Sequence, residues 1–250
     1  MLRLLCVTAH PDDEAGAFGG TLLLYASRGV ETHLVCLTSG QAATHRGDAR
    51  DDDELAAIRR RELGRSAEIL RLTSWECLHY PDGALDRQDF YSVVGELVRR
   101  IRTIRPHVVL TIGPEGAVTA HPDHSMVSVF TTMAYQWAAR SNRYTDQLDR
   151  GLQPHRAQKL YYGASLFTLP GRQPISPAPV TAVIEVGQEF VERKISAFKA
   201  HTSQAPLAPI FEKAVRQRGT RESFHLAATT SPREIERETD LFAGVKDEDV

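Results

Sequence analysis

Short apolar runs alternate along this chain with longer segments of helical periodicity. The apolar runs predict strands at 2–8, 32–38, 76–80 and 107–112. Apolar positions about 3.6 residues apart predict helices at 15–28, 51–70 and 89–104 and in a segment that ends at 140. Strands that alternate with helices in this way are typical of parallel strands joined by helical crossovers.

This order of elements predicts an α/β fold: a Rossmann-like, doubly wound, mostly parallel sheet with additional C-terminal strands and helices. The commonest strand order, 3-2-1-4, places the first and fourth strands side by side, with a crevice beyond their carboxyl ends. Further strands are expected at 159–167 and 179–186, and a helix at 188–201. The charged tail 234–250 is expected to fray at its end.

Composition excludes several classes of protein. The formal net charge is -2 and the sequence pI is about 6.6, so the chain lacks the basic excess of a nucleic-acid-binding protein. It contains neither a signal-peptide pattern nor an apolar run long enough for a membrane span. Three cysteines without Cys-x-x-Cys spacing are typical of small buried side chains in a reducing compartment. We therefore expect a cytoplasmic protein with no nucleic-acid or membrane partner.

The tripeptide His-Pro-Asp occurs twice, at 10–12 and 121–123, and each copy follows a predicted strand. Composition alone predicts roughly 0.03 occurrences, so two are not expected by chance. Proline fits the first turn of a helix, which puts each histidine at a cap-like position and the third residue beyond it about one turn away. This spacing pairs His10 with Asp13 and His121 with His124.

Two imidazoles and one carboxylate that converge with an open coordination position are the ligands of a catalytic zinc site. Each motif taken alone is equally well explained as a helix cap, because aspartates stabilise helix N-termini. Two such histidines at adjacent strand ends favour the metal interpretation. The glycine-rich segment 14–21 lacks both G-x-G-x-x-G and the P-loop lysine, so it is only a weak signal for phosphate binding.

The segments AHPDDE (9–14) and HPDH (121–124) together resemble the PIG-L/LmbE family of zinc-dependent N-deacetylases, which remove acetyl groups from N-acetylglucosamine-containing substrates. The resemblance continues through about residues 3–204, in TSG (38–40), Arg59 with Glu62 and Leu63, PDG (81–83), TIGPEG (111–116) and KAHTSQ (199–204). It implies a single domain over 1–250 with a core of about 3–204 and an extension at 205–250. Gln41 and Ala120 depart from the residues usual in the family.

The resemblance also implies roles for individual residues. One zinc ion per chain would be held by the matching ligands His10, Asp13 and His124. Asp12 matches the general base that takes a proton from water. His121 matches a histidine that stabilises the oxyanion and protonates the leaving amine, and Asp123 is placed to orient it and raise its basicity.

Substrate contacts are less constrained by the sequence. Arg59, His201 and Gln204 match substrate-contacting or pocket-wall positions, although Arg59 fits an exposed helix residue beside Arg60 and Arg61 equally well. The expected substrate is a small N-acetylated amino-sugar conjugate, and the loops 41–50, 114–120 and 141–179 would set its identity. The alternative is a non-catalytic metal- or sugar-binding module on the same fold. A homo-oligomer is compatible with the sequence.

Overall fold

The computed structural model describes residues 1–164, 175–231, 234 and 236–247. Within these residues, seven strands form one sheet in the order β3-β2-β1-β4-β5-β7-β6. The strands are β1 (Arg3–Thr8), β2 (Glu31–Thr38), β3 (Ser74–Tyr80), β4 (Val108–Ile112), β5 (Lys159–Gly163), β6 (Ala182–Glu185) and β7 (Arg221–Thr229). The first five are parallel, and β7 runs antiparallel to both β5 and β6. The predicted order 3-2-1-4 and the α/β class are confirmed.

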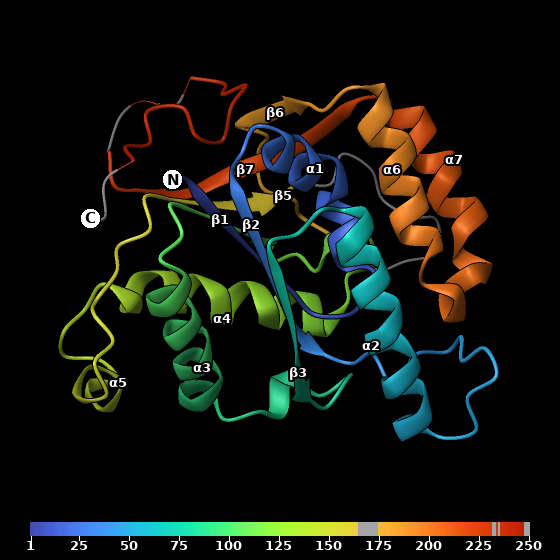
Figure 1. The fold of residues 1–250 in the computed structure, drawn as a ribbon, viewed down its shortest axis with the longest axis horizontal. Helices are drawn as coiled ribbons and strands as arrows, with labels where there is room; N and C mark the ends of the chain where they lie inside the picture. The colour runs from blue at the N-terminus through green and yellow to red at the C-terminus, as the bar shows by residue number, and fades with distance from the viewer. Residues whose placement is uncertain (165–174, 232–233, 235, 248–250) are drawn as a thin grey trace.

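Helices cover both faces of this sheet (Figure 1). They are α1 (Gly19–Ser27), α2 (Asp52–Ile69), α3 (Phe90–Ile104), α4 (Pro122–Ala138), α5 (Thr145–Asp149), α6 (Gln188–Lys199) and α7 (Ala208–Arg218). Helices α3 and α4 pack together at the lower left in this view, whereas α1, α2 and α6 pack on the other face of the sheet. The central strands β1 and β4 are therefore buried on both faces, which explains why they are almost continuously apolar.

The prediction of an α-helix at 15–28 is wrong for the first turn. Residues Glu14–Phe18 form a π-helical turn, and α1 begins only at Gly19. Both Glu14 and Phe18 are fully buried, and the wider turn directs them into the interior. Single π turns are frequent at functional sites.

The sequence pattern did not predict α5, α7 or β7, and β7 lies between β5 and β6 although it comes from the expected C-terminal extension. Part of the charged tail is packed as well, since Glu238 forms an ion pair with Lys159, and Leu241 is fully buried. The end of the tail, 248–250, and the last three residues of the strand predicted at 159–167 lie outside the described residues.

Two further predictions concern the cysteines and membrane spans. Cys6 and Cys36 are buried and Cys77 is partly buried, and all three are free thiols. Among the described helices, none combines the length and the apolar character that crossing a bilayer requires.

Candidate active site

The two His-Pro-Asp segments meet beyond the carboxyl ends of β1 and β4, which are neighbours in the sheet. His10 follows β1, whereas His121 and His124 belong to the start of α4. The ring centroid of His10 lies 4.8 Å from that of His121 and 5.2 Å from that of His124. Topology thus brings together residues that are more than a hundred positions apart.

The backbones of the two segments differ. Pro122 begins α4 and His121 is its N-cap, as predicted, with Nδ1 accepting a hydrogen bond from the Asp123 amide at 3.1 Å. Pro11 does not begin a helix, because Asp12 has a positive φ of 109° and the chain turns there. The prediction that His10 caps a helix is therefore wrong. The turn is closed instead by Asp13, whose Oδ2 accepts the amide of His10 at 2.8 Å.

One imidazole nitrogen from each of two histidines converges with a carboxylate. His10 Nδ1 lies 3.2 Å from His124 Nε2, which lies 3.1 Å from Asp13 Oδ1. His10 Nδ1 lies 3.7 Å from Asp13 Oδ2. Bonds of about 2.0–2.1 Å to a tetrahedral zinc place ligand atoms roughly 3.3 Å apart. The three side chains have the spacing of a metal site.

The remaining nitrogens of these histidines are already hydrogen-bonded. His10 Nε2 faces Asp82 Oδ1 at 2.9 Å, and His124 Nδ1 faces the Gly116 carbonyl at 3.2 Å. Because both partners are acceptors, each of these nitrogens carries a proton in the neutral ring. The two unprotonated nitrogens then face each other, an arrangement that a cation between them satisfies. The donor set fits a divalent metal.

A second cluster, His10 with His121 and Asp123, also has ligand atoms within 4.8 Å of one another. The Asp123 carboxylate, however, accepts the amides of Gly83 at 2.7 Å and Leu85 at 3.1 Å. Both of its oxygens are thus occupied by backbone donors, whereas Asp13 Oδ1 faces His124. The geometry favours Asp13 as the carboxylate ligand.

Acidic surroundings favour positive charge at this position. Burial alone would lower the pKa of His10, but hydrogen bonds to Asp123 and Asp82 raise it to about 10. Burial would raise the pKa of Asp13, but the attraction of His124 and His10 lowers it overall. The same carboxylates that stabilise a proton on His10 would stabilise a metal cation beside it.

Asp12 is held by Arg59. The Arg59 guanidinium donates to Asp12 Oδ2 at 3.0 Å, to the Gly40 carbonyl at 2.8 Å and to the Pro11 carbonyl. Arg59 is only 3% exposed, so its interpretation as an exposed helix residue is wrong. Gly40 has a φ of +65°, and a Cβ there would lie 2.0 Å from Arg59 Nη1. Burial raises the pKa of Asp12 to about 6 although Arg59 opposes the shift.

His121 lies beside His10 and His124, and its ring contacts the backbone amide of Asp123 and not the Asp123 carboxylate. The Asp123 carboxylate lies against His10, 3.3 Å from Nε2, and it is the backbone amide of Asp123 that contacts His121. Burial and the neighbouring His10 and His124 lower the pKa of His121, despite the attraction of Asp123 and Asp13. Asp123 thus raises the pKa of His121 as expected, but burial and the two neighbouring histidines outweigh it, so the net shift of that pKa is downward.

His201 and Gln204 contact the protein around the site. His201 Nε2 lies 2.8 Å from Glu14 Oε1, and Glu14 Oε2 accepts the Asp12 amide at 2.9 Å. Gln204 donates to the His45 carbonyl at 2.9 Å, in the loop 41–50. His201 thus supports the backbone of Asp12 through Glu14, and Gln204 holds the loop 41–50.

Two acids of the site had no role assigned from the sequence. Glu14 ends the first motif and Asp82 belongs to PDG, so the motifs themselves contained a signal. Glu14 is fully buried, and Asp82 bonds both His10 and, through Oδ2, the amide of Ala42 at 2.8 Å. Both acids position residues at the metal group.

Comparison with known proteins agrees with this geometry. The family model of PIG-L, GlcNAc-PI de-N-acetylase, matches residues 5–135. A mycothiol S-conjugate amidase of Streptomyces coelicolor is 29% identical over 98% of each chain. A 1D-myo-inositol 2-acetamido-2-deoxy-alpha-D-glucopyranoside deacetylase of Rhodococcus jostii is 32% identical over 83% of each chain.

The fold is shared with a solved deacetylase. The N,N'-diacetylchitobiose deacetylase of Pyrococcus horikoshii superposes with a TM-score of 0.75 at 24% identity, over 90% of this chain and 83% of that one. At this identity the likeness establishes the architecture alone.

Proposed function

This chain belongs to the PIG-L family and is a hydrolytic enzyme, and from that premise we propose that it is a zinc-dependent N-deacetylase acting on a small amino-sugar conjugate. The non-catalytic alternative is thereby set aside. The observation that carries the proposal is the convergence of His10, Asp13 and His124 with Asp12 beside them. A pure binding site has no need of a second, non-coordinating carboxylate there.

Zinc would be bound by His10 Nδ1, Asp13 and His124 Nε2, one ion per chain. Held there, it would supply Lewis acidity to the amide carbonyl and to a water molecule. The outer carboxylates Asp82 and Asp123 fix the tautomer of His10, and the Gly116 carbonyl fixes that of His124.

Asp12 is the proposed general base, and its carboxylate is oriented by Arg59 at 3.0 Å. It takes a proton from the attacking water while the water oxygen bonds to the acyl carbon. His121 stabilises the oxyanion and delivers a proton to the amine nitrogen as the C–N bond breaks. The products are a carboxylic acid and a free amine, and water is the only co-reactant.

The substrate class follows from the chemistry that the relatives share. The amidase of Streptomyces coelicolor and the deacetylase of Rhodococcus jostii are both named for cleavage of an amide-type bond. The name of the deacetylase specifies an acetamido sugar joined to inositol. We propose an N-acylated 2-amino sugar conjugate as substrate. The side chains of Arg59, His201 and Gln204 are hydrogen-bonded to other protein groups, so their proposed role is to shape the site around the substrate.

We also propose one domain over 1–250, since β7 is integral to the sheet.

The test is a screen of N-acetylglucosamine conjugates with the zinc-loaded protein, in which released acetate is quantified. Metal analysis of the same sample should give about one zinc per chain. The matched control is Asp12→Asn, which should bind zinc and release little acetate. Fully metallated protein that hydrolyses no amide in the screen would disprove the function.

A further inference from the structure

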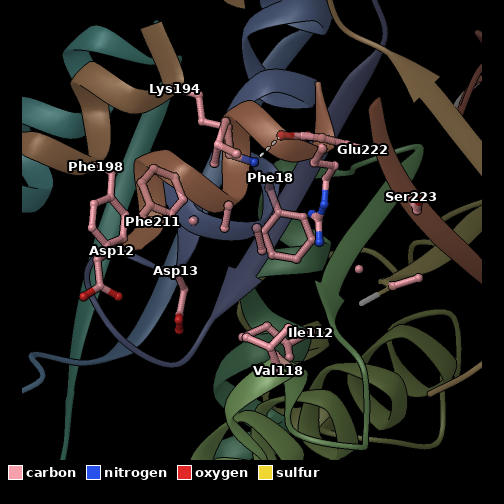
Figure 2. Close-up of a pocket in the computed structure, with 18 of the residues that line it drawn as sticks. Asp12, Asp13, Phe18, Ile112, Val118, Lys194, Phe198, Phe211, Glu222 and Ser223 are labelled. Atoms are coloured by element: carbon pink, nitrogen blue, oxygen red, sulfur yellow. Dashed lines mark hydrogen bonds and ion pairs between the residues drawn. The ribbon is translucent and has the colours of Figure 1, made fainter. Parts of the chain in front are cut away.

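A cavity of about 230 Å³ opens directly beside the proposed metal group. Asp12, Asp13 and His124 line one side of it, and the cavity continues between the π-helical turn Glu14–Phe18, the end of β4, and helices α6 and α7. Figure 2 shows both aspartates at its edge, and Phe18 as part of its wall. The inference drawn from this cavity rests on the proposed function and specifies its substrate.

The walls next to the aspartates are apolar. Phe198 and Phe211 lie beside Asp12 and stack on each other with centroids 3.9 Å apart, and Ile112 and Val118 lie beyond Asp13 (Figure 2). Gly16, Ala17, Ala164 and Ala214 also line the cavity and keep it open. Small residues between large apolar ones thus leave room for a ligand rather than for water alone.

Two charged groups in the wall bind each other. Lys194 forms a buried ion pair with Glu222, drawn as the dashed line in Figure 2. Glu222 also accepts the amides of Gly20 at 3.0 Å and Thr21 at 2.8 Å, at the start of α1. Because the Glu222 carboxylate is already paired, it adds little polarity to the cavity. The side of the cavity formed by the end of α7 and by β7 is more polar, because it is lined by Arg218, Arg221 and Ser223.

The cavity is too large for the acyl group of an acetamide. A cavity of about 150 Å³ already accommodates a benzene ring. An acetyl group would place a single methyl in this space of about 230 Å³. Unfilled apolar space contributes no binding energy to the transition state, whereas a larger apolar group would bury its surface here.

The position of the cavity indicates which part of the substrate enters it, the sugar or the acyl group. Of the site residues, its described lining contains Asp12, Asp13 and His124, whereas His121, Arg59 and Asp82 lie outside it. A sugar would lose hydrogen bonds from its hydroxyls against apolar walls, so its place is on the polar side. The acyl half then enters the cavity.

We propose that this cavity binds the acyl group of the substrate and that the enzyme prefers amides of amino sugars whose acyl group is larger and more apolar than acetyl. A short aliphatic or aromatic acyl group fits the dimensions. Hydrolysis breaks the C–N bond, adds the water oxygen to the acyl carbon and leaves a proton on the amine nitrogen.

The first experiment compares N-acetyl, N-butanoyl, N-hexanoyl and N-benzoyl derivatives of methyl glucosaminide with the zinc-loaded enzyme. We expect kcat/KM to rise about threefold to fourfold per added methylene until the cavity is filled. A parallel series keeps the N-acetyl group and lengthens an alkyl aglycone. A rate that rises only in the aglycone series, or that favours acetyl, would overturn the proposal and leave the deacetylase function intact. Failure of every amide would disprove the function itself.

The second experiment fills the cavity. Ala214→Trp places a large ring from α7 into it, and Ala214→Leu is a milder version that retains helix propensity. The control is Ile210→Trp on the same helix, where the side chain is 65% exposed and outside the cavity. We expect the hexanoyl-to-acetyl ratio of kcat/KM to fall at least about tenfold in Ala214→Trp, less in Ala214→Leu, and to stay unchanged in Ile210→Trp. An unchanged ratio in both Ala214 variants would refute the assignment.

Discussion

Asp82 is expected to control metal affinity although it is not a proposed ligand. Its Oδ1 lies 2.9 Å from His10 Nε2, and its Oδ2 accepts the Ala42 amide at 2.8 Å. The carboxylate therefore keeps the proton on Nε2 and makes Nδ1 a better electron donor toward a metal. Asp82→Asn keeps the shape and one acceptor oxygen but removes the charge. We expect this variant to bind zinc more weakly.

The magnitude follows from the geometry. Loss of an outer-shell partner of a metal-bound histidine costs about 10- to 100-fold in affinity. Asp123 Oδ2 lies 3.3 Å from the same nitrogen and remains in Asp82→Asn. We therefore expect about a tenfold loss, or about 1.4 kcal/mol, in the single variant. Asp82→Asn combined with Asp123→Asn should approach a hundredfold loss.

The assay is a competition titration of zinc against a chromophoric chelator at fixed pH. Asp86→Asn is the matched control, because Asp86 lies in the same loop, is half-exposed and forms an ion pair with the neighbouring Arg87. Its zinc affinity should equal that of the wild type. Wild-type affinity in both Asp82→Asn and the double variant would refute the argument that these carboxylates set the His10 tautomer.

Four further outcomes are expected. His124→Ala should lose most of its zinc, and full occupancy by metal analysis would remove His124 from the ligand set. Asp12→Asn should retain zinc and lose about 10²-fold or more in kcat/KM, measured as released acetate; normal activity per bound zinc would exclude Asp12 as the base. His121→Ala should retain zinc and lose at least about tenfold in rate, so an undiminished rate would exclude its role as acid. Burial favours the neutral form of Glu222, but Lys194 and the α1 amides hold its pKa below 4.5, so its stabilisation is present above that pH and is lost as the pH falls. In Lys194→Met with Glu222→Gln, the free energy of unfolding, measured with urea, should decline less steeply than in the wild type between about pH 5 and pH 3.

The predictable part of the fold is the part with a repeated apolar pattern. Strands such as β1 and β4 are continuous apolar runs because helices cover both of their faces. Strand β7 has the sequence RESFHLAAT, whose polar residues are typical of a surface segment. Its Glu222 is nevertheless buried. That burial is tolerable because Lys194 of α6 forms an ion pair with Glu222 and the amides of Gly20 and Thr21 donate to it. Such pairing across the fold is not visible in a local pattern.

The site was predictable to a different depth for each residue. Motif spacing and strand order predict that the pairs His10 with Asp13 and His121 with His124 converge, and the family resemblance implies which three of these residues are the ligands. The burial of Arg59 has a signal in the sequence, because Leu55, Arg59 and Leu63 recur every four residues and lie on one buried stripe of α2. The contact between Glu14 and His201 spans 187 positions and depends on how α6 packs, so no local rule predicts it.

The hydrogen bonds from Gly20 and Thr21 to Glu222 span 202 and 201 positions, and they have a consequence for folding. The first helix after the metal loop acquires its N-terminal cap from the last strand of the described sheet. Chain closure over such a distance is slow, because its entropy is lost before the contact is gained. During synthesis the N-terminal strands emerge first, with an uncapped helix beside the future zinc loop. We therefore expect a nascent chain to acquire a competent site only after β7 has docked.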